Sequence, residues 1–244
     1  MKKVLVCYAN YTGEKKEFFD SLTENNFREY CVRNNIEFYM IKDRLKHSID
    51  RHPTWMSWKI IDDLIDSGYL ADCDKVFSLD ADTCIVDMNA DLTSKKSFSY
   101  AIDSCNTHCM GFYSLTIDDW SKKLVKNVLN EDMYARLKDA PIWKMWNDQA
   151  SVYELFGIKR HSWEPFALLE NQGWHSAASP DTKYEIADLI EHVEILPTEY
   201  NITHVAGEGF NEYFINPTQG KDTIIRHFAG GPSWDAKYFS EVKR

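Results

Sequence analysis

The sequence predicts an α/β fold built on a mostly parallel central sheet, and two observations carry this prediction. Short runs of apolar and β-branched residues at 4–8, 36–41 and 76–79 have the length of buried strands. Between these runs, apolar residues recur at helical spacing, and strands that alternate with helices are typical of parallel sheets. The chain has 244 residues and no stretch with the composition of a linker. We therefore expect a single domain over residues 1–244.

The opening of the chain is predicted to be a strand, a helical connection and a second strand. The strand at 4–8 leads into turn-forming residues at 9–13, and apolar residues from 18 to 31 follow at helical spacing. Asn25 and Asn26 interrupt this spacing. Because asparagine side chains compete with the helix for backbone hydrogen bonds, we expect the pair to separate two helices.

The next connection is predicted to be a helix that starts at Pro53, since proline is favoured in the first helical turn. Gly68 marks its end, because glycine adopts the backbone conformation that terminates helices. The strand at 76–79 follows. Two further strands are expected, at 97–102 and 110–115.

The second half of the chain has weaker signals. Asp118 is a candidate N-cap for the helix that follows it, and another helix is expected at 147–150. Residues 166–181 are rich in Asn, Gly, Ser and Pro, which predicts a long loop. Late strands and turns are expected at 195–196, 207–210 and 224–228.

Composition excludes several classes of function. The net charge of −10 disfavours a nucleic-acid partner, because affinity for the phosphate backbone comes mainly from Lys and Arg. No apolar run reaches 18 residues, and the four-residue run near the start is too short for a signal peptide. Six scattered cysteines are typical of reduced thiols. We therefore expect a cytoplasmic protein without a membrane span.

Two carboxylates stand at the end of the strand at 76–79. Asp80 and Asp82 are two positions apart, so an extended backbone places both side chains on one side. Carboxylate oxygens suit Mg²⁺ or Mn²⁺, whose remaining coordination positions can take phosphate oxygens. An ordinary turn in which aspartates cap backbone N–H groups has the same pattern, so the pair alone leaves both interpretations open.

Four motifs in a fixed order strengthen the metal interpretation. They are Leu79-Asp80-Ala81-Asp82, Asn147-Asp148-Gln149, Leu196-Pro197-x-x-Tyr200-Asn201 and Ile225-x-His227-Phe228-Ala229-Gly230. Together they resemble the metal-dependent, retaining glycosyltransferases of the A-type fold, in particular the glycogenin-like group and the yeast-type α-galactosyl- and α-mannosyltransferases. The resemblance implies a Rossmann-like nucleotide-binding domain with a mixed, mostly parallel sheet flanked by helices. Residues 1–115 would bind the nucleotide sugar and residues 116–244 would face the acceptor.

The resemblance implies a metal site with three protein ligands. Asp80 would hold the ribose or the metal, Asp82 would hold the metal, and His227 would add an imidazole nitrogen from a late strand. An imidazole beside two carboxylates suits Mn²⁺ better than Mg²⁺. Without the motif order, His227 in its apolar strand is more simply interpreted as a core histidine.

Asp148, Gln149 and Asp103 are the candidate catalytic residues. In the resembling enzymes, the pair equivalent to Asp148 and Gln149 faces the donor sugar, where oxygen atoms stabilise positive charge at the anomeric carbon. Asp103 stands where these enzymes place an aspartate that accepts hydrogen bonds from the sugar hydroxyls. The simpler alternatives are helix capping for Asp148 and a strand-end turn for Asp103.

Further residues are candidates for binding the nucleoside diphosphate sugar. Tyr8 and Tyr11 offer rings on which a base could stack, although core packing is the simpler interpretation of Tyr8. In the resembling enzymes a basic residue at the position of Lys59 reaches the donor phosphate or sugar, and the simpler interpretation is a surface lysine. Gly230 and Lys237 are the candidates for the diphosphate, because the lysine that usually follows the His-x-x-Gly turn is absent.

The sequence therefore predicts a glycosyltransferase that moves a sugar from a UDP- or GDP-sugar to a carbohydrate or other hydroxyl acceptor. Mn²⁺ or Mg²⁺ would screen the diphosphate, and retention of configuration is implied by the resemblance. Two departures keep a non-catalytic relative that binds nucleotide sugars or carbohydrates open as the alternative. They are the absent lysine and Cys109-Met110-Gly111, where glycogenin-like enzymes usually have Asn before Gly. A nucleotidyltransferase is disfavoured, because the loop at 8–13 has one glycine and not a glycine-rich phosphate loop.

Overall fold

The computed structural model describes residues 2–13, 16–17, 19–43, 47, 49–103, 108–139, 147–158, 181–203 and 223–227. The strands are β1 Lys2–Tyr8, β2 Glu37–Ile41, β3 Cys73–Leu79, β4 Thr83–Ile85, β5 Phe98–Ile102, β6 His108–Thr116, β7 Val193–Leu196, β8 Ile202–Thr203 and β9 Ile225–His227. The α-helices are α2 Glu24–Arg33, α3 Met56–Asp66, α4 Asp119–Val128, α5 Glu131–Leu137, α7 Asp148–Phe156 and α8 Ile186–His192. Shorter helical turns are η1 Phe19–Thr23, η3 Pro53–Trp55 and η6 Thr198–Tyr200.

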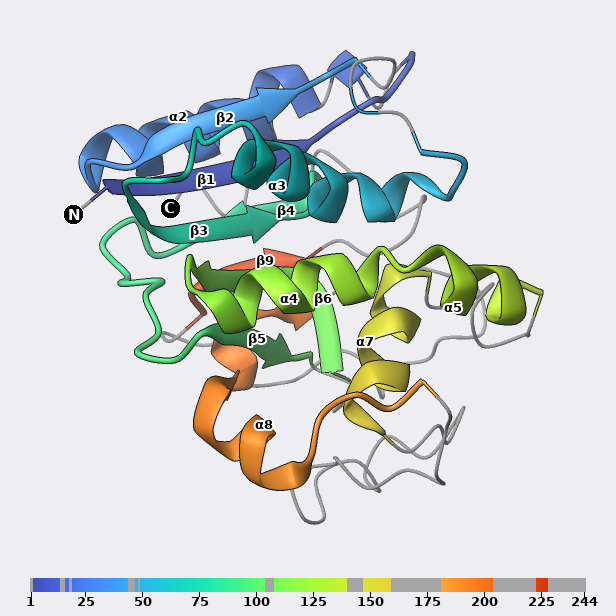
Figure 1. Ribbon diagram of the computed structural model, residues 1–244. Coiled ribbons are helices and arrows are strands. Elements are labelled where there is room, and N and C mark those ends of the chain that lie inside the picture. The colour runs from blue at the N-terminus through green and yellow to red at the C-terminus, as the bar shows by residue number, and fades with distance from the viewer. Residues whose placement is uncertain are drawn as a thin grey trace, which may run out of the picture.

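The central sheet has six strands in the order β2-β1-β3-β6-β5-β7 (Figure 1). β1 pairs parallel with β2 and β3, and β5 pairs parallel with β7. β6 lies antiparallel to both of its neighbours, β3 and β5. The sheet is therefore mixed and mostly parallel, as the sequence predicted. A second sheet has the order β4-β9-β8.

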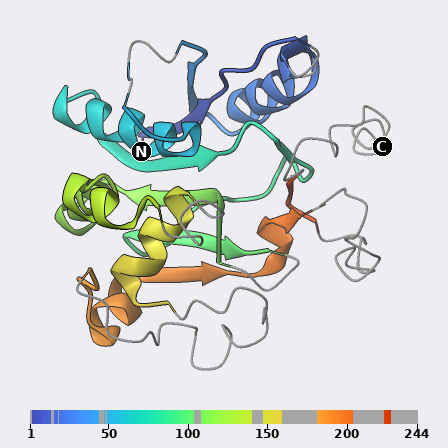
Figure 2. The same ribbon diagram turned by 90° about the vertical axis from the view of Figure 1, so that its right-hand side faces the viewer.

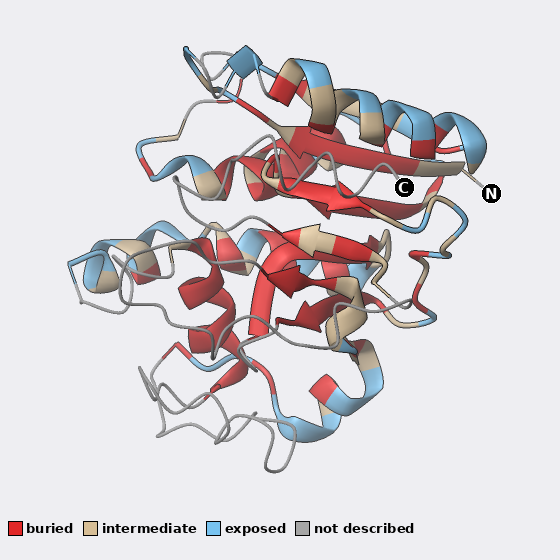
Figure 3. Ribbon diagram, turned by 180° about the vertical axis from the view of Figure 1, so that it is seen from behind, coloured by how far each residue is buried: buried red, intermediate tan, exposed pale blue. Residues whose placement is uncertain are grey.

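Helices cover both faces of the central sheet. Figure 2 shows α3, α4 and α7 on one side of the strands and α2 on the other. The alternation of side chains along β1 explains this layering, because Val4 and Val6 belong to the core under α3, whereas Leu5 and Cys7 belong to the core under α2. Strands buried on both faces need the continuous apolar runs from which they were predicted. Figure 3 shows β1 largely buried and the outer side of α2 exposed.

The predicted break at Asn25 and Asn26 is wrong. The turn η1 runs directly into α2, and both asparagines lie inside that helix. Asn26 instead forms two hydrogen bonds with the backbone of Ile85 on β4, each 2.8 Å long. The amide that could compete with the helix is thus bound to a neighbouring strand, which also ties α2 to the second sheet.

Most other predicted elements are confirmed where the structure describes them. The connection to β3 starts at Pro53, and Gly68 after its end has a φ of +77°. Asp118 caps α4, since its carboxylate accepts a 2.8 Å hydrogen bond from the backbone N–H of Ser121. The short helices α5 and α8 were not predicted. Of the loop expected at 166–181, residues 166–180 lie outside the described residues, as does the strand or turn expected at 207–210.

None of the helices in the described segments is long and apolar enough to cross a bilayer. The five cysteines that the structure describes are all free thiols.

Arg51 fastens the segment before α3 to the end of α4. Its buried guanidinium donates a 2.7 Å hydrogen bond to the carbonyl of Leu129, pairs with Glu131 at 3.0 Å and lies 4.3 Å from the centre of the Tyr134 ring. Removing it leaves a carbonyl at a helix end without its donor. We therefore expect Arg51→Ala to lower the free energy of unfolding by about 2–4 kcal/mol, measured by urea denaturation.

Arg33→Ala is the matched control for this prediction. Arg33 forms an exposed ion pair with Glu29 on the same helix, at 3.0 Å. Exposed pairs of this kind contribute less than about 0.5 kcal/mol. Equal losses of stability in the two variants would contradict the role given to Arg51.

Candidate functional site

The turn that holds Asp80 and Asp82 joins β3 to β4. The backbone N–H of Asp80 donates to the carbonyl of Gly111 on β6, at 2.9 Å. The carbonyl of Asp80 accepts from the N–H and the hydroxyl of Thr83, at 3.0 and 2.7 Å. Both ends of the turn are therefore fixed. The two carboxylates lie at the carboxyl end of β3, where open α/β sheets bind their ligands.

β9 brings His227 to this turn from far along the chain. β4 and β9 pair antiparallel, with Thr83 opposite His227, so the imidazole lies next to Asp82. Its Nε2 is 3.3 Å from Oδ1 of Asp82. One possible ligand atom from each of Asp80, Asp82 and His227 lies within 4.8 Å of the other two. The structure thus brings together the three residues predicted as metal ligands.

The charges of this cluster fit a divalent cation. Burial and the neighbouring Asp82 carboxylate raise the pKa of Asp80 to about 8, against the opposite effect of His227. Burial alone lowers the pKa of His227, but the Asp82 carboxylate outweighs it and raises that pKa well above its usual range. Without a cation, Asp80 and His227 therefore hold their protons more tightly, and these protons reduce the repulsion between the two carboxylates. A bound cation would take their place, so two carboxylates and one imidazole are a suitable donor set.

Gly111 makes room for the His227 ring. A Cβ atom at this position would lie 2.5 Å from Cε1 and 2.6 Å from Nδ1 of the imidazole. The ring is rigid and buried, so it cannot bend away from an added methyl group. The sequence drew attention to Gly111 only as part of a departure from the family pattern. Its role depends on a contact between β6 and β9, which the local sequence does not indicate.

We expect Gly111→Ala to displace the His227 ring and weaken Mn²⁺ binding at least about tenfold, measured by calorimetry. Gly68→Ala is the control, because Gly68 has a φ of +77° and no heavy atom within 4 Å of an added Cβ. That control strains the backbone without touching the site, so it should lose stability and keep its Mn²⁺ affinity. Wild-type affinity in Gly111→Ala would contradict the assignment of His227 as a ligand.

Asn201 contacts the opposite edge of the imidazole. Its Oδ1 lies 3.1 Å from Nδ1 of His227, and the side chain is fully buried between η6 and β8. Sulfur Sγ of Cys109 lies 3.8 Å from the same nitrogen. The sequence placed Asn201 in a motif without giving it a role. The order of the motifs was the signal that could have paired it with His227.

Asp148 begins α7 and faces α3. Its Oδ2 accepts a 3.1 Å hydrogen bond from the indole N–H of Trp58, whose ring is stacked on Tyr113 with 4.3 Å between ring centres. Burial raises the pKa of Asp148 to about 6, and hydrogen bonds from Thr54 and Trp58 oppose this rise. The charge of Asp148 also helps raise the pKa of Asp80. The two carboxylates therefore share one electrostatic environment.

Gln149 is bonded to β6. Its Oε1 accepts from the backbone N–H of Met110 at 3.1 Å, and its Nε2 donates to the hydroxyl of Tyr153 at 2.8 Å. That hydroxyl donates in turn to the carbonyl of His108, at 2.7 Å. These bonds hold α7 against the sheet. A contact between Gln149 and a donor sugar stays a prediction.

Tyr8 and Tyr11, the two residues predicted to stack on a base, lie in different surroundings. For Tyr11, burial and then the charges of Asp82 and Asp80 raise the pKa, and its ring centre lies 6.0 Å from that of Phe19. Tyr8 ends β1 and packs against the core under α3. The hydroxyl of Tyr8 is buried and has no hydrogen-bond partner among the described residues. Tyr11 is thus the better placed of the two for binding a base.

Asp103 and Lys59 also lie in different surroundings. Asp103 directly follows β5 and is buried close to Tyr153, whose pKa it helps raise after the larger effect of burial. Lys59 forms an ion pair with Asp63 one turn along α3, and Asp63 also bonds Nδ1 of His47 at 2.7 Å. No contact of Lys59 with the acidic pair is seen in the described parts. Gly230 and Lys237 lie outside the described residues.

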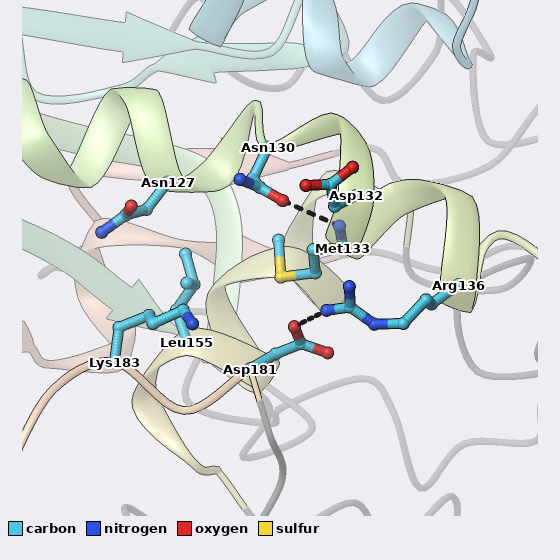
Figure 4. A pocket seen from close by; sticks show the side chains of 8 residues that line it. All are labelled: Asn127, Asn130, Asp132, Met133, Arg136, Leu155, Asp181 and Lys183. Atoms are coloured by element: carbon cyan, nitrogen blue, oxygen red, sulfur yellow. Dashed lines mark hydrogen bonds and ion pairs between the residues drawn. The ribbon is translucent and has the colours of Figure 1, made fainter.

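A separate polar pocket of about 150 Å³ lies among α5, α7 and residues 181–183 (Figure 4). Figure 4 shows Arg136 paired with Asp181, and Asp132 and Lys183 also line the pocket. The pocket therefore has no net charge. Its volume is below the roughly 300–1,000 Å³ of ordinary small-molecule sites. We assign it no ligand.

Comparisons with known proteins bear on the fold. No protein-family profile and no curated protein matches the chain. Among solved structures, a glycosyltransferase involved in glycosylation of the major capsid of PBCV-1 is similar over 100% of this chain and 99% of that one, with a TM-score of 0.57 and 11% identity. The similarity to the galactosyltransferase LgtC covers 99% of this chain and 95% of that one, with a TM-score of 0.46 and 14% identity. The similarity to mouse xyloside xylosyltransferase 1 covers 93% of this chain and 97% of that one, with a TM-score of 0.44 and 8% identity.

The similarity to the PBCV-1 enzyme spans both chains almost completely, so it shows the fold. The other two similarities have lower scores and add no argument. The chain has the A-type glycosyltransferase fold, as the sequence predicted.

Proposed function

We propose that this protein is a glycosyltransferase that moves a sugar from a nucleoside diphosphate sugar to a hydroxyl acceptor. The observation that carries the proposal is the approach of Asp80, Asp82 and His227 within 4.8 Å, at the carboxyl end of β3 in a fold of this type. Two carboxylates and an imidazole favour Mn²⁺ over Mg²⁺. UDP- or GDP-sugars are the donors, and transfer with retention follows from the resemblance to the glycogenin-like and yeast-type enzymes.

One group of residues would stabilise the departing diphosphate, and another would stabilise the sugar as the bond to the diphosphate breaks. Asp80, Asp82 and His227 would hold the cation, which supplies charge stabilisation for the departing diphosphate. The charge of Asp148 acts on Asp80, and burial raises the pKa of Asp148 to about 6. Its carboxylate can stabilise the positive charge that develops at the anomeric carbon as the bond to the diphosphate breaks.

Other donor contacts extend the proposal to both halves of the chain. Tyr11 would stack on the base, and Asp103 would accept hydrogen bonds from the sugar hydroxyls. Gly230 and Lys237 would bind the diphosphate through backbone N–H groups and an ammonium group. Residues 1–115 would supply most of the donor side, and residues 116–244 would face the acceptor and add His227, Gly230 and Lys237 to the donor site.

A non-catalytic, sugar-binding relative is the second candidate. The bonding of Gln149 favours it, because both ends of that amide already have partners in the protein. The absent lysine after the His-x-x-Gly turn favours it too. The complete set of Asp80, Asp82 and His227 favours the enzyme, since a module that only binds sugars has no need to stabilise a leaving group.

A thermal-shift screen tests the donor site. The protein is heated with UDP, GDP and their common sugars, each with and without Mn²⁺. We expect a rise in melting temperature that requires both nucleotide and Mn²⁺, because a ligand present at 100 times its Kd stabilises the native state by about 2.7 kcal/mol. A folded sample that shows no shift with any nucleotide would contradict the proposal.

A further inference from the structure

We infer that Asn201 is a positioning residue for the candidate metal centre. Its side-chain oxygen fixes the His227 ring so that Nδ1 carries the proton and Nε2 keeps its lone pair for a cation. The inference rests on the proposed function, because it needs His227 to be a metal ligand. It assigns a role to a residue that would not itself touch the metal.

The two nitrogens of His227 face different partners. Nε2 points to the acidic pair, 3.3 Å from Oδ1 of Asp82, and Nδ1 lies 3.1 Å from Oδ1 of Asn201. An amide oxygen can only accept a hydrogen bond, so Nδ1 must be the donor. In the neutral ring, which has a single N–H, Nε2 is then free to bind a metal.

The backbone holds Asn201 in place for this contact. Its N–H donates to the carbonyl of Thr198 at 2.8 Å, at the end of η6. The next two residues form β8, which pairs parallel with β9 and sets Thr203 opposite His227. Both partners are therefore fixed by one small sheet. In known metal sites, a histidine that binds the metal through one ring nitrogen donates the N–H of the other to an oxygen acceptor. The oxygen of Asn201 is such an acceptor for Nδ1 of His227.

Stability alone does not explain an asparagine at this position. The other amide atom, Nδ2, is buried and has no hydrogen-bond partner among the described residues. An unpaired buried donor destabilises a protein, and an apolar side chain would avoid that loss. Sγ of Cys109 lies 3.8 Å from the same nitrogen, but sulfur is a weak acceptor, so the oxygen of Asn201 is the stronger partner for a proton on Nδ1.

Mn²⁺ calorimetry on two variants tests the inference. Asn201→Leu keeps the branched shape of the side chain and removes the acceptor, so we expect the Mn²⁺ affinity to fall about 10- to 100-fold. Asn201→Asp keeps an oxygen facing Nδ1, so it should bind Mn²⁺ within a few-fold of wild type. The melting temperature in EDTA identifies any variant that fails to fold.

Asn127→Ala is the control. Its amide donates a 3.0 Å hydrogen bond to the hydroxyl of Tyr184, away from the acidic pair. This variant should lose a hydrogen bond and keep its Mn²⁺ affinity. A fall in affinity equal to that of Asn201→Leu would overturn the inference.

A nuclear magnetic resonance experiment tests the wild-type protein directly. Long-range ¹H–¹⁵N spectra report which ring nitrogen of His227 is protonated, with Zn²⁺ as a diamagnetic substitute for Mn²⁺. We expect Nδ1 protonated and Nε2 bound to the metal. The reverse assignment, or unchanged Mn²⁺ affinity in Asn201→Leu, would overturn this inference alone. A wild-type protein that binds no Mn²⁺ would overturn the proposed function as well.

Discussion

Asp82→Ala should abolish Mn²⁺-dependent binding of UDP, GDP and their sugars while the fold is retained. Asp82 stands in a turn, and its carboxylate is the group that lies 3.3 Å from the imidazole of His227. Without it, one carboxylate and one imidazole are too few protein ligands to hold the cation. We expect Mn²⁺ affinity to fall more than about 100-fold, measured by calorimetry.

Asp87→Ala is the matched control, because it removes the same charge from the next exposed turn, where Asp87 accepts a 2.9 Å hydrogen bond from the N–H of Asn89. It should leave Mn²⁺ binding unchanged. Asp82→Ala should also remain folded in EDTA, since losing Asp82 removes a carboxylate that raises the pKa of Asp80. Metal-dependent nucleotide binding that survives in Asp82→Ala would refute the metal assignment.

Asp148→Asn should slow sugar transfer about 100- to 1,000-fold and leave nucleotide and Mn²⁺ binding near wild type. The amide keeps the shape and can still accept the hydrogen bond from Trp58, but it has no charge to stabilise the anomeric carbon. Steady-state kinetics measure the loss. The wild-type rate should fall as the pH drops below about 6, where Asp148 becomes protonated, and the variant should lack that dependence.

Asp119→Asn is the control for Asp148→Asn, because it makes the same change in the first turn of α4, where Asp119 is exposed. Its transfer rate should equal that of wild type. If Asp148→Asn turns over normally, the carboxylate serves the fold through Trp58 and the start of α7, as the helix-capping alternative holds.

The sequence was most informative where one strand carries the signal. β1 is a buried apolar run, and apolar residues dominate β2 and the end of β3, so their parallel sheet could be predicted from composition and spacing. Asp80 and Asp82 do meet, but not through the alternation expected for an extended backbone, because both lie in the turn after β3, which is closed by the 3.0 Å hydrogen bond from the N–H of Thr83 to the carbonyl of Asp80. The short helices α5 and α8, each seven residues long, have too few turns for a helical period to show.

The parts that were missed depend on contacts between distant segments. Nothing near Gly111 in the sequence indicates that the ring of His227 lies against it, and the pairing of β4 with β9 creates that contact. The wrong break at Asn26 has the same cause, since its amide binds the backbone of Ile85. His227 was identified as a ligand through the order of motifs, because its apolar strand alone favours a core residue.

Release of UDP or GDP from a nucleotide sugar is the measurement that tests the central claim most directly. Wild-type protein and Asp82→Ala are incubated with each donor, with and without Mn²⁺, and the free nucleotide is measured. The proposed function predicts release that requires Mn²⁺ and is absent in Asp82→Ala. Nucleotide sugars that bind in the presence of Mn²⁺ but are not cleaved, with any acceptor supplied, would show a binding module and contradict the account.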